Sequence, residues 1–144
     1  MSAADTAASR FGEGFNCAQS VLSAYAEQLG LDTDTALKLA ASYGAGIARM
    51  AETCGAVTGA LMVVGLKHGF TTAADAEGRE SVYRKAREFT ARFTERNGSL
   101  VCRELLGCDI STLEGMQQAR DQQLFRTTCP RLVRDAAEIL GEMG

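Results

Sequence analysis

The sequence predicts an all-α protein, a single compact bundle of six to eight helices around a central glycine-rich helix. Pro130 is the only proline among 144 residues, and runs of β-branched residues are few. Apolar residues recur at helical spacing, and no segment has the alternating pattern and tight turn of a β-hairpin. No linker, repeat or change of composition divides the chain, so residues 1–144 are expected to form one domain.

Two helices are expected in the first third of the chain. Asn16 can cap the first, which closes at Gly30. The second begins at Asp32 or Thr33 and stops at Gly44. The first helix carries apolar residues along one side, namely Ala18, Leu22, Tyr25 and Leu29.

The central helix is expected in the segment "ETCGAVTGALMVVGL", residues 52–66. It has no charge from Thr53 to Leu66, and this run of 14 residues is shorter than the roughly 20 needed to cross a bilayer. Gly55 and Gly59 are four residues apart and therefore share one helix face. Since each glycine costs about 1 kcal/mol relative to alanine in a helix, we expect another backbone or a ligand to approach closely, with close packing preferred.

The clearest amphipathic helix lies between the cap candidates Thr72 and Asp75 and the stop signal Asn97-Gly98. Its apolar face is traced at steps of four, three and four by Val82, Ala86, Phe89 and Phe93. Basic and acidic residues alternate on the opposite face, which predicts a solvated surface and not a nucleic-acid interface.

Three shorter elements are expected after this helix. Ser99 opens a helix that ends at Gly107, and the Ser111–Glu114 pair has the spacing of a capping box for a polar helix to about Leu124. The last helix is expected to start after Thr128. Its apolar stripe comprises Leu132, Val133, Ala136, Ile139 and Leu140.

Composition narrows the classes of partner and location. The formal net charge is −3 and the charges are scattered, so neither nucleic acid nor a membrane is an expected partner. The start "MSAADTAASRFGEG" lacks a basic end and an apolar run, so no secretory signal is expected and the expected location is the cytoplasm. Five cysteines are many for a reducing compartment, where they more often indicate metal binding or redox chemistry than structural disulfides.

Four of the five cysteines are expected in the first turn of a helix. Cys17 follows Asn16, Cys54 follows Thr53, Cys129 follows Thr128, and Cys102 lies three residues after Ser99. The free N–H groups and the dipole at a helix start stabilise a thiolate, so these positions lower the pKa of a cysteine. The alternative for each is an inert, buried cysteine. If the helix of Cys54 runs on unbroken from Ile47, the dipole argument fails for Cys54.

The segments "FNCAQSVL", "GAGIARMAETCGAVTGALMVVGLKHG", "CRELLGCDIST" and "CPRLVRDAAEIL" together resemble the C_GCAxxG_C_C family, a redox-active family named for its cysteine pattern. The resemblance covers nearly the whole chain. It implies a small helical protein whose cysteines act together in redox or metal chemistry. By the resemblance, the four positions fall to Cys17, Cys54, Cys102 and Cys129, with Cys108 as an additional thiol.

Two points of this resemblance stay open. Cys102 and Cys108 flank "RELLG", and either one can fill the third place of the pattern. The family pattern also puts glycine before the central cysteine, whereas here Thr53 precedes Cys54 and Gly55 follows it.

Three functions follow from these cysteines. The first is a thiol–disulfide or electron-transfer site with Cys54 as nucleophile and a resolving thiol from Cys17, Cys102 or Cys129, acting on an unidentified redox partner. The second is a metal ion or iron–sulfur cluster held by Cys17, Cys54, Cys102 and Cys129. The third is a helical module whose cysteines only pack. The sequence does not decide whether the protein is an enzyme, and its small-residue central helix is compatible with a homodimer.

Three charged or titratable residues near the central segment could tune a thiol, namely Arg49, Glu52 and His68. His68 follows Lys67 at the expected end of the central helix, where it is expected to face the helix dipole and not to act as a base. Glu52 is expected to be a surface carboxylate. No C-x-x-C pair occurs, so the site is not of the thioredoxin type, and the absence of C-x-x-C-H argues against covalent haem.

Overall fold

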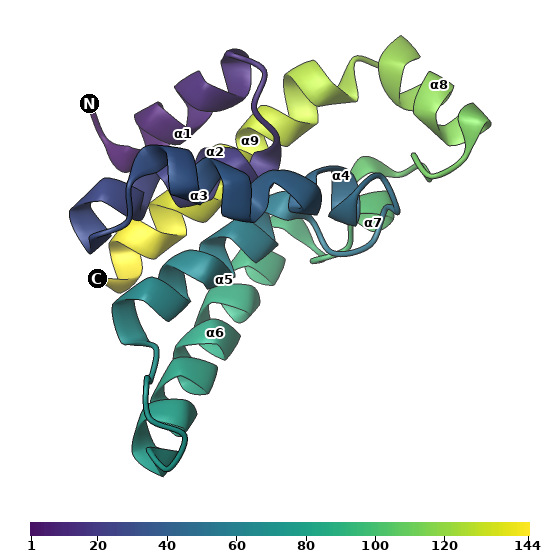
Figure 1. The fold of residues 1–144 in the computed structure, drawn as a ribbon. Helices are drawn as coiled ribbons and strands as arrows, with labels where there is room; N and C mark the ends of the chain where they lie inside the picture. The colour runs from purple at the N-terminus through teal and green to yellow at the C-terminus, as the bar shows by residue number, and fades with distance from the viewer.

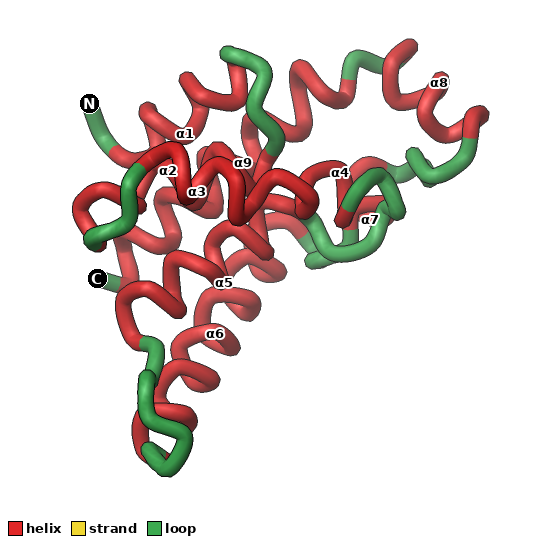
Figure 2. The backbone as a smooth tube through the Cα atoms, viewed as in Figure 1, coloured by secondary structure: helices red, strands yellow, loops and turns green.

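Eight right-handed α-helices make up most of the chain in this computed structural model, which describes residues 1–144 (Figure 1). Figure 2 shows only helices and loops, so the all-α prediction is confirmed. Two short 3₁₀ segments, η1 (Glu27–Leu29) and η2 (Ala41–Tyr43), extend α2 and α3. The eight helices are α1 (Ala3–Gly12), α2 (Cys17–Ala26), α3 (Thr33–Ala40), α5 (Gly55–His68), α6 (Ala76–Asn97), α7 (Cys102–Leu106), α8 (Leu113–Asp121) and α9 (Leu124–Met143).

The segment α4 (Gly44–Ile47) differs from the other helices because its turn is left-handed. Backbone φ lies between 50° and 67° at Ala45, Gly46, Ile47, Ala48 and Arg49. The N–H of Ala48 donates to the Ser42 carbonyl at 2.9 Å, and further backbone hydrogen bonds from residues 50–52 close the turn. A left-handed turn costs each non-glycine residue roughly 1–2 kcal/mol, so the surrounding contacts must hold this segment in place.

Several predicted helix boundaries are confirmed. The side chain of Asn16 accepts the N–H of Gln19 at the start of α2, and Gly30, with φ of 86°, ends η1. Asp32 caps α3 in the same way. Asp75 caps α6, which ends at Gly98 as expected from the Asn-Gly pair.

Other boundaries differ from the sequence prediction. Helix α1 was not predicted, although Ser2 and Asp5 form a capping box at its start. Helix α7 begins at Cys102 behind Val101, not behind Ser99. The side chain that caps α8 is that of Thr112, whose oxygen accepts the N–H of Gly115, because the hydroxyl of the predicted Ser111 is bonded to Asp109 instead.

The last helix begins at Leu124, five residues before Cys129, which is its predicted first residue. Pro130 therefore lies inside α9, where it lacks the N–H that would donate to the carbonyl of Arg126. Because Arg126 is exposed, water can bind this carbonyl, and the helix continues through the proline.

Helix α5 packs on α2, α6 and α9, as its predicted central place requires (Figure 1). A Cβ atom on Gly59 would lie 2.6 Å from the carbonyl oxygen of Ala18 in α2, so the glycine permits the predicted close packing of two backbones. Phe89 and Phe93 of α6 are fully buried, and the predicted stripe of α9 is buried as well. These side chains belong to one cluster of 31 buried apolar residues.

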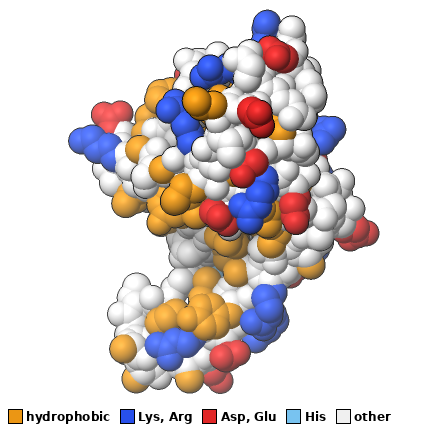
Figure 3. Space-filling view, turned by 90° about the vertical axis from the view of Figure 1, so that its right-hand side faces the viewer, with side chains coloured by type: hydrophobic (Ala, Val, Ile, Leu, Met, Phe, Trp, Pro, Cys, Tyr) orange, Lys and Arg blue, Asp and Glu red, His pale blue; other side chains and the backbone are white.

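Acidic and basic side chains are interspersed on the face shown in Figure 3, in keeping with the scattered charges of the sequence. No helix in the structure is both apolar and long enough to span a membrane.

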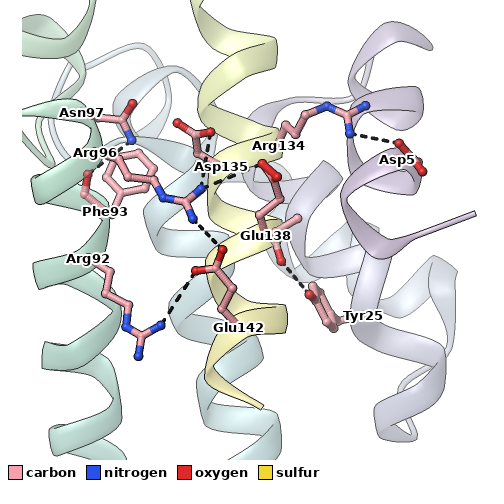
Figure 4. A network of polar contacts seen from close by, with 11 residues as sticks. Asp5, Tyr25, Arg92, Phe93, Arg96, Asn97, Arg134, Asp135, Glu138 and Glu142 are labelled. Carbon is pink, nitrogen blue, oxygen red and sulfur yellow. Dashed lines mark hydrogen bonds and ion pairs between the residues drawn. The ribbon is translucent and has the colours of Figure 1, made fainter.

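Helix α9 is held by polar contacts on two sides (Figure 4). On one side the guanidinium of Arg96 in α6 lies 2.7 Å from the carboxylate of Glu142. On the other side Arg134 lies 3.0 Å from Asp5 of α1. The buried hydroxyl of Tyr25 in α2 donates to the carbonyl of Ala137 at 2.7 Å. These contacts fix α9, and hence Cys129, relative to α2 and Cys17.

Candidate active site

Cys17 is the first residue of α2, as predicted. Its neighbour Asn16 caps the helix through its side-chain oxygen, and the side-chain nitrogen of Asn16 donates to the Ala41 carbonyl at 2.9 Å. The start of α2 is thereby tied to the segment that leads into the left-handed turn.

Cys54 and Cys102 are brought side by side by an antiparallel bridge between Thr53 and Val101. The N–H of Cys54 donates to the Leu100 carbonyl at 2.8 Å, and that of Cys102 donates to the Glu52 carbonyl at 2.6 Å. Cys54 is itself the N-cap residue of α5, one position before the predicted first turn. The helix does not run on from Ile47, because the left-handed turn separates the two segments.

Cys129 differs most from its predicted place. It is the sixth residue of α9, because the helix starts at Leu124, so the argument from the helix dipole does not apply to it. Its side chain is buried among α9, α2 and the bridge segment, and it meets the thiol of Cys17.

The left-handed turn lies against the sulfur-bearing residues. A Cβ atom on Gly46 would lie 2.7 Å from the Cβ of Cys102, and Gly46 has a φ of 67°. Glycine is therefore required at this position by space, and it adopts this φ without the strain that its non-glycine neighbours bear. On the other side, a Cβ atom on Gly55 would lie 3.0 Å from the Cβ of Cys17.

Four of the five sulfurs are close enough to act on one another's ionisation. Thiolate charges on Cys54, Cys129 and Cys102 all raise the pKa of Cys17. The charge of Cys108 raises the pKa of Cys102 alone among the cysteines. The pKa of Cys108 is itself raised by burial and by the charge of Asp109. All five side chains are buried and all five thiols are free. The structure thus brings together four of the predicted site residues, with Cys108 at the edge of this cysteine cluster.

Cys17 and Cys129 are the two thiols of the cluster that affect each other's pKa most strongly. The hydrogen bond with Cys129 raises the pKa of Cys17 well above its ordinary value, and burial adds to this. The same hydrogen bond lowers the pKa of Cys129, although burial opposes it. The two thiols therefore titrate as one coupled pair, in which the first thiolate formed is stabilised by the S–H that remains.

The other two thiols of the cluster are held neutral. Burial raises the pKa of Cys54 to about 11, and the backbone N–H groups of Ala56 and Val57 offset only part of this. Burial raises the pKa of Cys102 to about 12, with the charges of Cys54 and Cys129 adding to it. The lowered pKa that the sequence predicts at helix starts is therefore absent at both positions, because desolvation outweighs the helix end.

Three of the cysteines, Cys17, Cys102 and Cys129, line a cavity of about 130 Å³. An apolar cavity of roughly 150 Å³ is enough to admit benzene, so this space accepts a few heavy atoms of a ligand. The remaining lining residues are Phe11, Asn16, Ala45, Leu106, Ile110 and Phe125. Because four of these are only half-buried, the cavity meets the surface beside α1, α4 and α9.

Sequence reasoning did not identify the apolar residues of this lining. Asn16 carried a signal as a helix cap, but Phe11 lies in the unpredicted α1 and Ala45 in the unpredicted left-handed turn. Only the three-dimensional path of the chain places these residues beside the sulfurs.

The predicted tuning residues do not reach the cluster. The carboxylate of Glu52 is exposed and lies 3.2 Å from the guanidinium of Arg103. His68 is the last residue of α5, as predicted, and its pKa is lowered by burial and by the charges of Lys85 and Lys67. Arg49 is exposed at the end of the left-handed turn. The charges that shift the pKa values of the clustered thiols are those of the cysteines themselves and of Asp109.

The cysteine cluster has the residue types of a metal site. Four thiolates suit zinc or an iron–sulfur centre. In the structure, however, no three Cys, His, Asp or Glu side chains are arranged so that they could hold a metal ion. The predicted ligand set is thus assembled as neighbours but not as a coordination shell.

Comparison with known proteins supports the resemblance seen in the sequence. No curated protein and no solved structure matches the chain significantly. A sequence model of the family described as "Putative redox-active protein (C_GCAxxG_C_C)" matches residues 15–143, which include all five cysteines. The chain therefore belongs to the C_GCAxxG_C_C family.

Proposed function

We propose that the cysteine cluster performs thiol–disulfide exchange, with Cys129 as the attacking thiol and Cys17 as the resolving thiol. The observation that carries this proposal is that these two thiols line the same cavity and interact directly there. A facing pair is what exchange requires, since the second sulfur must reach the first without rearrangement of the fold. The lowered pKa of Cys129 increases the fraction of its reactive thiolate.

The exchange balances without a bound cofactor. Cys129 loses its proton and attacks one sulfur of an external disulfide R–S–S–R′, which forms a Cys129–S–S–R bond and releases R′–S⁻ to take up a proton. Cys17 then loses its proton and attacks the sulfur of Cys129, which releases R–S⁻ and forms a Cys17–Cys129 disulfide. Two protein thiols are oxidised and one disulfide is reduced to two thiols.

This assignment differs from the sequence prediction, in which Cys54 is the nucleophile. Cys54 does not line the cavity, and its pKa of about 11 keeps it protonated near neutral pH. Cys102 lines the cavity but is protonated for the same reason. In the proposal both remain neutral thiols beside the reacting pair.

Mass spectrometry after oxidation tests the proposal. The reduced protein is treated with a small disulfide, free thiols are alkylated, and linked peptides are identified. The expected product is a Cys17–Cys129 linkage. In Cys17→Ser the reaction is expected to stop at a mixed disulfide on Cys129, whereas Cys108→Ser is the matched control that leaves the linkage intact. A linkage that bypasses both Cys17 and Cys129 contradicts the proposal.

Metal analysis of the purified protein decides between thiol exchange and a metal site. Anaerobically purified protein with about one bound zinc ion or iron–sulfur cluster per chain would replace the exchange proposal, and the cysteines would then act as ligands. If replacement of all five cysteines by serine or alanine leaves stability and any cellular phenotype unchanged, the helical module with packed cysteines is the right account.

Partners and location remain predictions. A homodimer is supported by an apolar cleft of about 360 Å³ between α3 and α5. Leu39 and Leu66 on its rim are 56% and 39% exposed, which is unusual for large apolar side chains that flank a cleft. Sedimentation velocity over a range of concentrations distinguishes monomer from dimer. The cytoplasmic location and the redox partner remain predictions from composition.

A further inference from the structure

A second pocket lies next to the cysteine cavity. It has a volume of about 300 Å³ and differs from the cysteine cavity in its charge, because it carries two arginines, Arg49 and Arg120. Ile110, Met116 and the exposed Leu113 add apolar surface to the lining, which Ser111 and Thr112 complete. The pocket therefore combines an apolar surface with two positive charges.

The local structure explains how these residues meet. Leu113, Met116 and Arg120 are three and four residues apart in α8, so they share one helix face. Arg49 comes from the end of the left-handed turn, where its φ is 67°. The costly backbone conformation of that turn thus also brings a cation to this pocket.

Both arginines are free to bind a ligand. Neither Arg49 nor Arg120 forms an ion pair or a side-chain hydrogen bond in the structure. The nearby carboxylate of Asp109 keeps its negative charge and accepts the N–H of Ser111 at 3.0 Å, so it pairs with neither arginine. Figure 3 shows basic side chains beside apolar ones on the upper part of this side of the molecule, at the height of α8 in Figure 1.

Ile110 lies between the two spaces. Its side chain, 3% exposed, lines both the cysteine cavity and the arginine pocket. A ligand held by the arginines therefore lies one side chain away from the space that Cys17 and Cys129 line. A molecule with a short apolar body and an anionic end fits this arrangement.

We propose that the arginine pocket binds the carboxylate of a low-molecular-weight disulfide and directs its sulfur atoms to the Cys17–Cys129 pair. This inference rests on the thiol–disulfide exchange proposed above and names its substrate class. The carboxylate binds Arg49 and Arg120, the methylene groups cover Ile110, and the disulfide enters the cavity. Exchange then follows the two balanced steps already described.

Three disulfides of similar size test the substrate class. They are 3,3′-dithiodipropionate, which is a dianion, bis(2-hydroxyethyl) disulfide, which is neutral, and cystamine, which is a dication. Stopped-flow or quenched-flow measurement gives the rate of Cys17–Cys129 oxidation for each. Because the three differ in intrinsic reactivity, the informative quantity is how each rate changes between wild type and variant.

The variants are Arg49→Gln, Arg120→Gln and the control Arg84→Gln, which removes an exposed arginine of α6 away from both spaces. Arg49→Gln and Arg120→Gln are each expected to slow the dianion about fivefold, the upper range for one exposed ion pair, and to leave the neutral probe unchanged. Arg84→Gln is expected to leave both rates unchanged, and Arg49→Lys should restore part of the rate. Equal effects on the dianion and the neutral probe, or no effect on either, would overturn the assignment.

A ligand that cannot exchange separates this inference from the proposed function. Suberate has the length of dithiodipropionate with carbon in place of sulfur, and its binding is followed by NMR through the side-chain N–H signals of Arg49 and Arg120. Shifts at these two arginines and not at Arg84 support the pocket even if exchange fails. If the neutral disulfide oxidises Cys17 and Cys129 but suberate does not shift the arginines, exchange stands and the anion pocket is refuted.

Discussion

Replacement of Ala48 by glycine should stabilise the protein, which is the reverse of the usual effect of this substitution. Ala48 lies in the middle of the left-handed turn, with φ of 50° and ψ of 40°. Its side chain is exposed, so removal of the methyl group forfeits little packing. The substitution therefore reports mainly on the backbone conformation.

The magnitude follows from two opposing effects. Glycine relieves the left-handed conformation, which costs alanine roughly 1–2 kcal/mol. It also increases the conformational entropy of the unfolded chain, which costs about 0.4–1 kcal/mol. The expected net gain is about 0.5–1 kcal/mol. Ala91 is the matched control because it is exposed in the right-handed helix α6, where Ala91→Gly should cost about 1 kcal/mol.

Urea denaturation of the reduced protein, followed by circular dichroism, measures both variants against wild type. The two free energies of unfolding should differ by about 1.5–2 kcal/mol, with Ala48→Gly the more stable. If Ala48→Gly loses as much stability as Ala91→Gly, the segment is not left-handed in solution. The account of how Gly46 and Arg49 are positioned would then fail as well.

Three further outcomes are expected from the same assay. Gly59→Ala should lower the free energy of unfolding by about 1–3 kcal/mol, because the new Cβ overlaps the Ala18 carbonyl 2.6 Å away; Gly65→Ala, whose Cβ meets nothing within 4 Å, should not. Tyr25→Phe should cost about 1–2 kcal/mol by leaving the buried Ala137 carbonyl without its donor, and no loss would show that water replaces the hydroxyl. Stability should fall between pH 9 and 11, because the unfolded thiol ionises near 9.0 whereas folded Cys54 stays protonated to about 11. Cys54→Ala should show a shallower fall, and an identical slope would contradict the raised pKa.

Local signals in the sequence were sufficient to predict most of the helices. Asn16, Asp32 and Asp75 cap their helices through side-chain oxygens, and Gly30 and Gly98 end theirs in the left-handed region. Capping depends on a few adjacent residues, so it can be recognised without knowledge of the fold. The close approach at Gly59 was predictable for a similar reason, since a helix interior rarely keeps a glycine without a packing partner.

Two features depended on the whole fold and were not predicted. Of the five residues with positive φ in the left-handed turn, only Gly46 is of a type that favours this conformation. The other four are alanine, isoleucine and arginine residues, which give no local preference for it. Cys129 follows a good cap residue, Thr128. It nevertheless lies within α9, because the helix follows Gln123 and starts at Leu124, four residues before Thr128. In both cases tertiary contacts override the local signal.

The cysteines and glycines of the family pattern meet one spatial requirement. A Cβ atom on Gly46 would clash with the Cβ of Cys102, and one on Gly55 would press on the Cβ of Cys17, so a side chain at either glycine would displace a cysteine. The Thr53–Val101 bridge then places Cys54 beside Cys102, and α9 brings Cys129 to Cys17. Because these contacts are between backbones and Cβ atoms, they fix where the Cβ atoms of the cysteines lie, and each sulfur can then reach only the few positions that its rotamers allow. The small residues around Cys54 are therefore needed to assemble the cluster, because they let the helices pack closely enough to bring the cysteines together.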